Sequence, residues 1–232
     1  MKKVIFTLIV LLVIGFSRSV AQNYDVVYSM KMNPETIIKM VSKESGVPKA
    51  MLSFIKDDIR KAELMVSLRM TKDKCDMNFL KDKSKFVISL MGIKMDAAAM
   101  FENAGINTYS DYAKNISYTK INIEGQNYTV KTPLEEEPNY KSVNLYKTIL
   151  GHECQKMEDG KNKSSVWYAT DIPFTTKMFP GVPGLVLEIT EESEGFTFTA
   201  TSVKSTKEDV TLPKNAKEVT EKEINKMLEN MH

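Results

Sequence analysis

Apolar and polar side chains alternate with a period of two in several segments of this 232-residue chain. In the clearest segment the apolar positions are Ala62, Leu64, Val66, Leu68 and Met70. The same rhythm recurs in segments 75–79, 86–90, 116–123, 128–132, 185–189 and 196–200. Because successive side chains of a β-strand point to opposite faces, this alternation predicts strands with one buried and one solvated face.

Two helical regions interrupt the predicted strands. Asn33-Pro34-Glu35 is typical of a helix start, and we expect a helical insert over 34–60. Thr220 and Glu223 form a capping box before a C-terminal helix over 220–231. Its apolar side is expected to dock on the sheet, with a partner-binding tail as the alternative.

These elements together predict a β-rich α+β fold. About nine or ten antiparallel strands with few helices favour an antiparallel curved sheet or a half-open β-barrel. The N-terminal helices are expected against the concave face of this sheet, and the C-terminal helix completes the fold.

Residues 1–21 have the pattern of a secretory signal peptide. Lys2 and Lys3 precede an apolar run over 4–16, and small residues occupy positions 19 and 21. As a helix, this run would cover about 20 Å of a bilayer core of roughly 30 Å, so it is too short to span a membrane. We therefore predict cleavage between Ala21 and Gln22 and export to the periplasm or the medium. The mature chain, 22–232, is expected to be a single β-rich domain without a transmembrane segment.

The charge of the predicted mature chain is close to neutral. Removal of Lys2, Lys3 and Arg18 changes the formal net charge from +2 to −1. Acidic and basic residues are interleaved, whereas nucleic-acid binding normally requires a clustered basic patch. We therefore expect no nucleic-acid partner.

The two cysteines, Cys75 and Cys154, leave two alternatives open. Outside the cytoplasm they could form a disulfide, provided that their Cα atoms lie within about 7 Å of each other. The other alternative is two separate buried thiols.

Groups that carry out catalysis are scarce in the sequence. His152 lies near Cys154 on a predicted strand, and the only other histidine is His232. No zinc-type spacing, nucleophile elbow, phosphate-binding loop or dinucleotide fingerprint occurs. We predict a non-enzymatic protein with no catalytic residue, metal or cofactor; thiol chemistry at Cys154 is the one exception considered.

A glycine- and proline-rich stretch precedes the strand at 185–189. Pro183-Gly184 suits a tight turn, because proline fixes φ and glycine accepts a positive φ. The sequence therefore predicts that Gly184 has a positive φ and sets the entry to this strand.

This stretch also resembles a known family. Gly181-Val182-Pro183-Gly184-Leu185-Val186 is similar to the Gly-Leu-Pro-Gly-Leu-Ile signature of the GLPGLI family, exported proteins of the Bacteroidota, with Val182 and Val186 in place of the usual Leu and Ile. Gly151 and Cys154 match a second family strand, and Trp167 and Tyr168 match a third, so that the resemblance covers 148–190. It implies an exported protein with a β-rich fold, and no reaction. The layout is also similar, by architecture alone, to the LolA-like lipoprotein-carrier fold.

The chain contains 15 methionines, several of them on predicted strands or helix faces. Methionine side chains fill irregular cores and also line permissive apolar pockets. We therefore predict an exported, periplasmic, non-enzymatic binding module that holds an apolar small molecule, lipid or lipoprotein between the sheet and its helices. The alternative is a structural or protein-interaction component of the cell envelope, in which an edge strand or the terminal helix holds an envelope protein.

Overall fold

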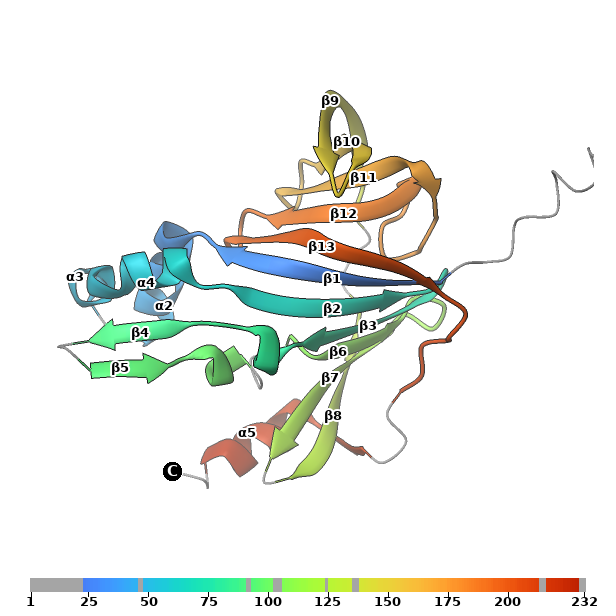
Figure 1. Cartoon of the computed structure of the whole chain (residues 1–232). Helices are drawn as coiled ribbons and strands as arrows, with labels where there is room; N and C mark the ends of the chain where they lie inside the picture. The colour runs from blue at the N-terminus through green and yellow to red at the C-terminus, as the bar shows by residue number, and fades with distance from the viewer. Residues whose placement is uncertain are drawn as a thin grey trace, which may run out of the picture.

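The computed structural model describes residues 23–45, 48–90, 93–101, 106–123, 125–134, 138–212 and 216–229. Twelve strands form one large curved sheet in the order β14-β8-β7-β6-β3-β2-β1-β13-β12-β11-β10-β9 (Figure 1). They are β1 (Asn23–Met32), β2 (Leu64–Met70), β3 (Lys74–Phe79), β6 (Thr108–Asp111), β7 (Ile116–Ile123), β8 (Gln126–Pro133), β9 (Lys141–Ile149), β10 (His152–Asp159), β11 (Ser164–Pro173), β12 (Gly184–Glu191), β13 (Phe196–Thr206) and β14 (Lys217–Val219). The sheet is not closed into a barrel, and β14 and β9 are its two ends. The predicted β-rich α+β fold with a curved sheet is confirmed.

The strand pairs of this sheet are antiparallel except for β14 and β8, which are parallel. A separate two-stranded sheet consists of β4 (Val87–Leu90) and β5 (Ile93–Asp96). The helices are α2 (Pro34–Ser45), α3 (Lys49–Leu52), α4 (Lys56–Lys61) and α5 (Glu221–Glu229), with short 3₁₀ segments at Ser53–Ile55, Lys81–Lys83 and Ala98–Phe101. Within the described ranges, no helix is both long enough and apolar enough to cross a bilayer. The predicted signal peptide and the Ala21/Gln22 cleavage site lie outside the described residues.

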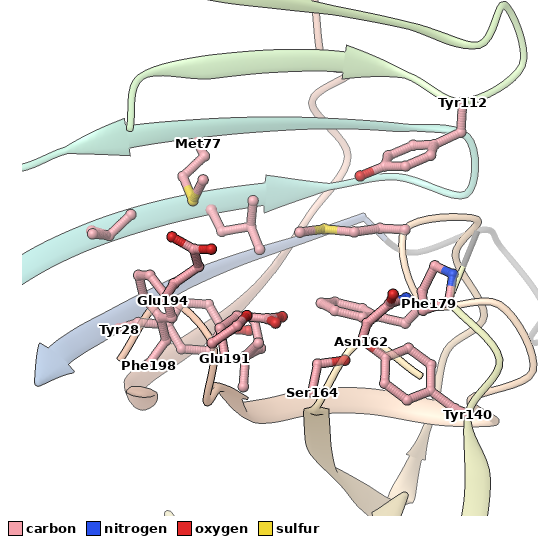
Figure 2. A pocket seen from close by; sticks show the side chains of 16 residues that line it. Tyr28, Met77, Tyr112, Tyr140, Asn162, Ser164, Phe179, Glu191, Glu194 and Phe198 are labelled. Atoms are coloured by element: carbon pink, nitrogen blue, oxygen red, sulfur yellow. The ribbon is translucent and has the colours of Figure 1, made fainter. Parts of the chain in front are cut away.

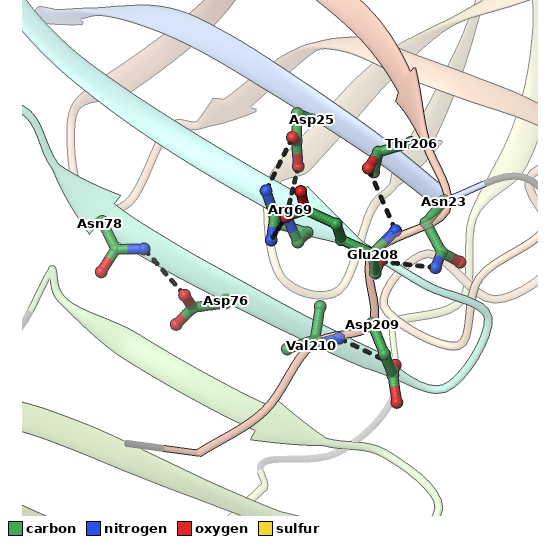
Figure 3. A network of polar contacts seen from close by, with 9 residues as sticks. All are labelled: Asn23, Asp25, Arg69, Asp76, Asn78, Thr206, Glu208, Asp209 and Val210. Atoms are coloured by element: carbon green, nitrogen blue, oxygen red, sulfur yellow. Dashed lines mark hydrogen bonds and ion pairs between the residues drawn. The ribbon is translucent and has the colours of Figure 1, made fainter. Parts of the chain in front are cut away.

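At the centre of the sheet, side chains that alternate along the sequence point to a buried face and to a more exposed face. The side chains of β1 and β2 that face the core are Tyr24, Val26, Tyr28, Met30, Met32, Leu64, Val66, Leu68 and Met70. On the opposite face, Arg69 forms ion pairs with Asp25 and with Glu208, both at 2.6 Å (Figure 3). The period-two prediction for 62–70 is therefore confirmed in β2, and β1 has the same alternating burial. Register shifts at Val27/Tyr28 and Trp167/Tyr168 mark bulges, which add local bend and twist.

The N-terminal helices begin as the sequence predicts and gather at one end of the sheet (Figure 1). The side chain of Asn33 caps α2, since its Oδ1 accepts a hydrogen bond from the backbone N–H of Thr36 at 3.1 Å. The next helical segment is broken into α3, a 3₁₀ turn and α4. At this break Ser53 donates its hydroxyl to the carbonyl of Ala50 at 2.6 Å, a side-chain bond that competes with regular helix geometry.

The C-terminal segment lies at the β14 end of the sheet, beside β7 and β8 (Figure 1). The backbone N–H of Thr220 donates to Glu223 at 2.8 Å, and the N–H of Glu223 donates to Thr220 Oγ1 at 3.2 Å, so the predicted capping box is present. Ile224 of α5 is buried against Ile123 and Val130. The apolar face of the helix is therefore docked on the sheet, the first of the two alternatives.

One segment differs from its prediction. The sequence suggests a single strand over 145–156, but the chain reverses between β9 and β10. Leu150 and Gly151 form the tip of this hairpin with φ values of 52° and 85°. Two consecutive residues with positive φ are what a type I′ hairpin turn requires. Gly151 of the family-like region thus has a conformational role.

Candidate functional site

A cavity of about 630 Å³ lies on the apolar face of the curved sheet (Figure 2). Its floor consists of strand side chains, namely Tyr28, Val66, Leu68, Met77, Ile189 and Phe198. Its rim comes from chain reversals and strand ends, with Tyr112, Pro138, Tyr140, Asn162, Ser164, Met178, Phe179, Glu191, Ser193 and Glu194. The site therefore combines a floor fixed by the sheet with a rim built from several loops.

Strand register explains why the floor is apolar. Tyr28 pairs with Val66, Leu68 with Met77, and Ile189 with Phe198, so that each pair points to the same face. The hydroxyl of Tyr28 donates to the carbonyl of Val186 at 2.7 Å, and burial raises the pKa of this phenol. Because the polar end of Tyr28 is already satisfied, the residue contributes an apolar ring to the cavity.

The helices do not line this cavity. They fill a neighbouring part of the same face, where Ile38 and Ile59 pack with Met30 and Leu64. The expectation that a ligand would lie between the sheet and its helices is therefore wrong for this cavity. The helical insert covers only one end of the sheet, and loops cover the part with the hollow.

Glu191 places a carboxyl group in the apolar lining. Burial first, and then the nearby charges of Glu194 and Asp159, raise the pKa of Glu191 to about 7. No ion pair within the described ranges joins Glu191 to a lysine or arginine. Among the residues that the structure describes, the cavity thus holds an acid without a compensating cation.

Sequence reasoning missed Glu191, although a signal for it was present. The period-two rhythm of β12 places Glu191 on the same face as Leu187 and Ile189. Because Glu191 begins the acidic run before Gly195, it looks like part of a solvated turn.

The turn that carries Glu194 is fixed to the start of α2. The N–H of Gly195 donates to the carbonyl of Glu191 at 2.9 Å, and the Gly195 carbonyl accepts from the N–H of Asn33 at 2.7 Å. Gly195 has a φ of +72°, and a Cβ here would lie 2.7 Å from the Cβ of Thr36. Glycine therefore allows this turn to approach the helix and holds Glu194 at the rim.

Asp159 organises another part of the rim. Its carboxylate accepts hydrogen bonds from the N–H of Asn139 at 3.3 Å, the N–H of Lys161 at 3.0 Å and the side chain of Asn162 at 2.6 Å. Burial acts to raise the pKa of Asp159, but these hydrogen bonds outweigh it and the pKa is lowered. Asp159 therefore remains a fixed anion that orders the loops beside Tyr140 and Ser164.

The two cysteines are buried free thiols in one hydrophobic cluster. Of the two alternatives that the sequence left open, the structure has the separate thiols. Burial raises the pKa of both Cys75 and Cys154. The thiol of Cys154 donates to the backbone carbonyl of His152 at 3.5 Å, whereas the imidazole Nδ1 lies 2.8 Å from Asp171. The side chains of His152 and Cys154 thus have different partners, which argues against an activated thiolate.

Both thiols should be inert in the folded protein. With Ellman's reagent at pH 7 we expect almost no reaction within minutes, followed by two thiols per chain after unfolding in guanidinium. The reason is that a buried thiol with a raised pKa is neither accessible nor ionised. Fast reaction of one thiol under native conditions would contradict this arrangement. No reaction after unfolding without reductant would show that the disulfide forms.

The family-like motif 181–186 follows the cavity-lining residue Phe179 but does not itself line the cavity, and its turn is displaced from the predicted position. The N–H of Val182 donates to the carbonyl of Phe179 at 3.2 Å, and Gly181 has a φ of +79°. The turn is therefore Pro180-Gly181. The prediction of a positive φ at Gly184 is wrong, since Gly184 begins β12 in an ordinary conformation. The residues on either side of Pro183-Gly184 are core, because Val182, Leu185 and Val186 are buried.

The remaining motif residues lie outside the cavity. Trp167 lies under Lys147, whose Nζ is 4.3 Å from the ring centroid, and Lys147 pairs with Glu188 at 2.6 Å. The hydroxyl of Tyr168 donates to Gln155 Oε1 at 2.6 Å. The bond from Tyr168 to Gln155 joins the neighbouring strands β11 and β10, whereas Lys147 reaches from β9 to side chains of β11 and β12. These contacts link strands of the sheet, which is a structural role.

No family model matches the chain, and no curated protein sequence matches it either. The resemblance of 148–190 to the GLPGLI family and the LolA-like layout therefore stay predictions. Among solved structures, PNGF-II in a C2 space group is similar over 90% of this chain and 33% of its own, with 15% identity and a TM-score of 0.46. PNGF-II in a P21 space group is similar over 89% and 33%, with 16% identity and a TM-score of 0.44. The chain spans about a third of the length of these structures, and TM-scores below 0.5 do not define a shared function.

Proposed function

We propose that this protein is an exported, non-enzymatic binding module that holds a hydrophobic ligand, such as a lipid or the acyl part of a lipoprotein. The observation that carries the proposal is the cavity of about 630 Å³ on the apolar face of the sheet. Cavities of roughly 300–1,000 Å³ are typical of small-molecule sites. Export is supported by the sequence of residues 1–21.

The lining suits ligands of variable shape. Met77 lies on the floor and Met178 on the rim, and both side chains are unbranched and polarizable. Aromatic rings from Tyr28, Phe198 and Phe179 provide rigid apolar contacts around them. Such a lining favours an acyl chain over a ligand that requires many directed hydrogen bonds.

Titration with Nile red, a neutral apolar dye, tests the proposal. We expect saturable binding of one dye per chain. Met77→Trp should weaken it at least tenfold, because the larger side chain occupies the cavity. Met95→Trp is the matched control, since Met95 lies on β5, is 51% exposed and does not line the cavity. Absence of saturable binding to the unsubstituted protein would refute the proposal, and equal binding by the two variants would place the dye elsewhere.

A further inference from the structure

The cavity is apolar along its floor and acidic at one side of its rim. Glu191 ends β12, and Glu194 follows in the turn to β13. Figure 2 shows both carboxyl groups among the lining side chains, in the part where Met77, Tyr28 and Phe198 also lie. Asp159, at the end of β10, adds a third negative charge nearby, but its oxygens are taken up by the loop that it orders.

From this arrangement we infer that the ligand is a cationic amphiphile, with its apolar chain on the sheet and an ammonium group against Glu191 and Glu194. This inference rests on the proposed function and adds the chemical class of the ligand. A positive group would supply the counter-charge that no described lysine or arginine provides to Glu191. The ring of the partly buried Phe198 adds a second attraction, because aromatic faces stabilise alkylammonium groups.

A metal ion fits the site less well than an organic cation. Within the described part of the chain, no cluster of three or more histidine, cysteine, aspartate or glutamate side chains could hold a metal. The floor of the same cavity consists mainly of apolar side chains, which suit an alkyl chain. Two carboxyl groups beside an apolar hollow therefore favour a ligand that carries both a charge and a chain.

Binding of such a ligand should depend on pH through Glu191. The other ionisable groups around it are Glu194, Asp159, Tyr28, Tyr112 and Tyr140. The pKa of Asp159 is lowered, and burial raises the pKa of the three phenols, that of Tyr140 to about 12. Asp159 therefore stays ionised and the three phenols stay neutral between pH 6 and pH 8, whereas Glu191 with a pKa of about 7 gains its charge in this range.

Calorimetric titration with three ten-carbon probes tests the inference. The probes are decyltrimethylammonium, decan-1-ol and decanoate, which share a ten-carbon chain. The two ions are used below their micelle-forming concentrations and the alcohol below its solubility limit. At pH 8 we expect the cation to bind at least tenfold more tightly than the alcohol, and decanoate to bind most weakly. Because the charge of decyltrimethylammonium is permanent, a fall to pH 6 should weaken its binding by about five- to tenfold through protonation of Glu191. Decan-1-ol should bind equally at both pH values.

Substitution of Glu191 assigns the effect to this residue. In Glu191→Gln, the preference for the cation and its pH dependence should shrink at least fivefold, while binding of decan-1-ol is kept and shows that the cavity is intact. Glu153→Gln, at an exposed position of β10, is the control and should behave like the unsubstituted protein.

The possible results distinguish the inferred cationic ligand from the proposed binding function. Equal binding of cation and alcohol, tighter binding of decanoate, or an unchanged preference in Glu191→Gln would overturn the inference and leave the apolar cavity as proposed. If none of the three probes binds, the proposed function itself fails.

Discussion

Replacement of Gly184 with alanine is expected to lower the free energy of unfolding by about 3 kcal/mol, the upper range for added atoms in a packed core. A Cβ at this position would lie 2.2 Å from the carbonyl oxygen of Ala169 and 2.7 Å from the ring of Tyr168. The carbonyl belongs to β11, which pairs with β12 on both sides of this point, so the strand cannot easily move away. Guanidinium denaturation followed by circular dichroism measures the change.

Gly181→Ala is the matched control for this prediction. Gly181 has a φ of +79°, but nothing lies within 4 Å of the position that its Cβ would take. The substitution should therefore cost only about 1 kcal/mol, the penalty of a non-glycine residue in the left-handed region. If Gly181→Ala destabilises the protein more than Gly184→Ala, the close contact between β11 and β12 is misplaced.

These two glycines show where reasoning from the sequence stops. The stretch contains Pro180-Gly181 and Pro183-Gly184, and each pair fits the chemistry of a tight turn. Only the contact with Ala169, on a strand that is distant in sequence, reveals that Gly184 is required for space and Gly181 for its conformation. Local propensity identifies both as special positions but cannot assign their roles.

The strands themselves were predictable wherever one face is buried. The alternation in β1 and β2 is strict, because their core-facing residues share one apolar face. It fails at β9, the end of the sheet, where Leu145 and Tyr146 are both exposed and no period of two is imposed. The hairpin after β9 was missed for a second reason: leucine at position 150 has a φ of 52°, whereas turns of this kind usually contain asparagine or glycine.

The cavity could be predicted only in part. The alternation of apolar and polar residues predicts an apolar face on a bent sheet. The rim of the cavity, however, comes from five separate chain reversals and strand ends, and no local sequence pattern predicts that these segments lie close together. The same holds for the helices, whose apolar sides are visible in the sequence. Their position at the ends of β1 and β2 involves contacts between segments distant in sequence, such as the close approach of Gly195 to Thr36.

Replacement of Glu191 with glutamine is expected to stabilise the protein at pH 8 by about 2 kcal/mol. The pKa of Glu191 rises from 4.5 to about 7 on folding, so the native state binds this proton more tightly than the unfolded state. The stability that the protonated acid provides is complete below about pH 4.5 and is lost as the pH rises to 7. The full shift in the pKa of Glu191 corresponds to roughly 3 kcal/mol of folding free energy. We expect a smaller effect, because the side chain is only half-buried. Glutamine is neutral throughout and avoids this loss.

Thermal unfolding at pH 5, 6, 7 and 8 measures the effect. The melting temperature of Glu191→Gln should exceed that of the unsubstituted protein at pH 8, and the difference should shrink steadily towards pH 5. Glu153→Gln should show no such trend, because its carboxylate is exposed on β10. A constant difference across the four pH values, or a Glu191→Gln variant that is less stable at pH 8, would mean that Glu191 is not a desolvated acid. The same result would remove the uncompensated charge from which a cationic ligand is inferred, because a well-solvated carboxylate needs no counter-charge from a ligand.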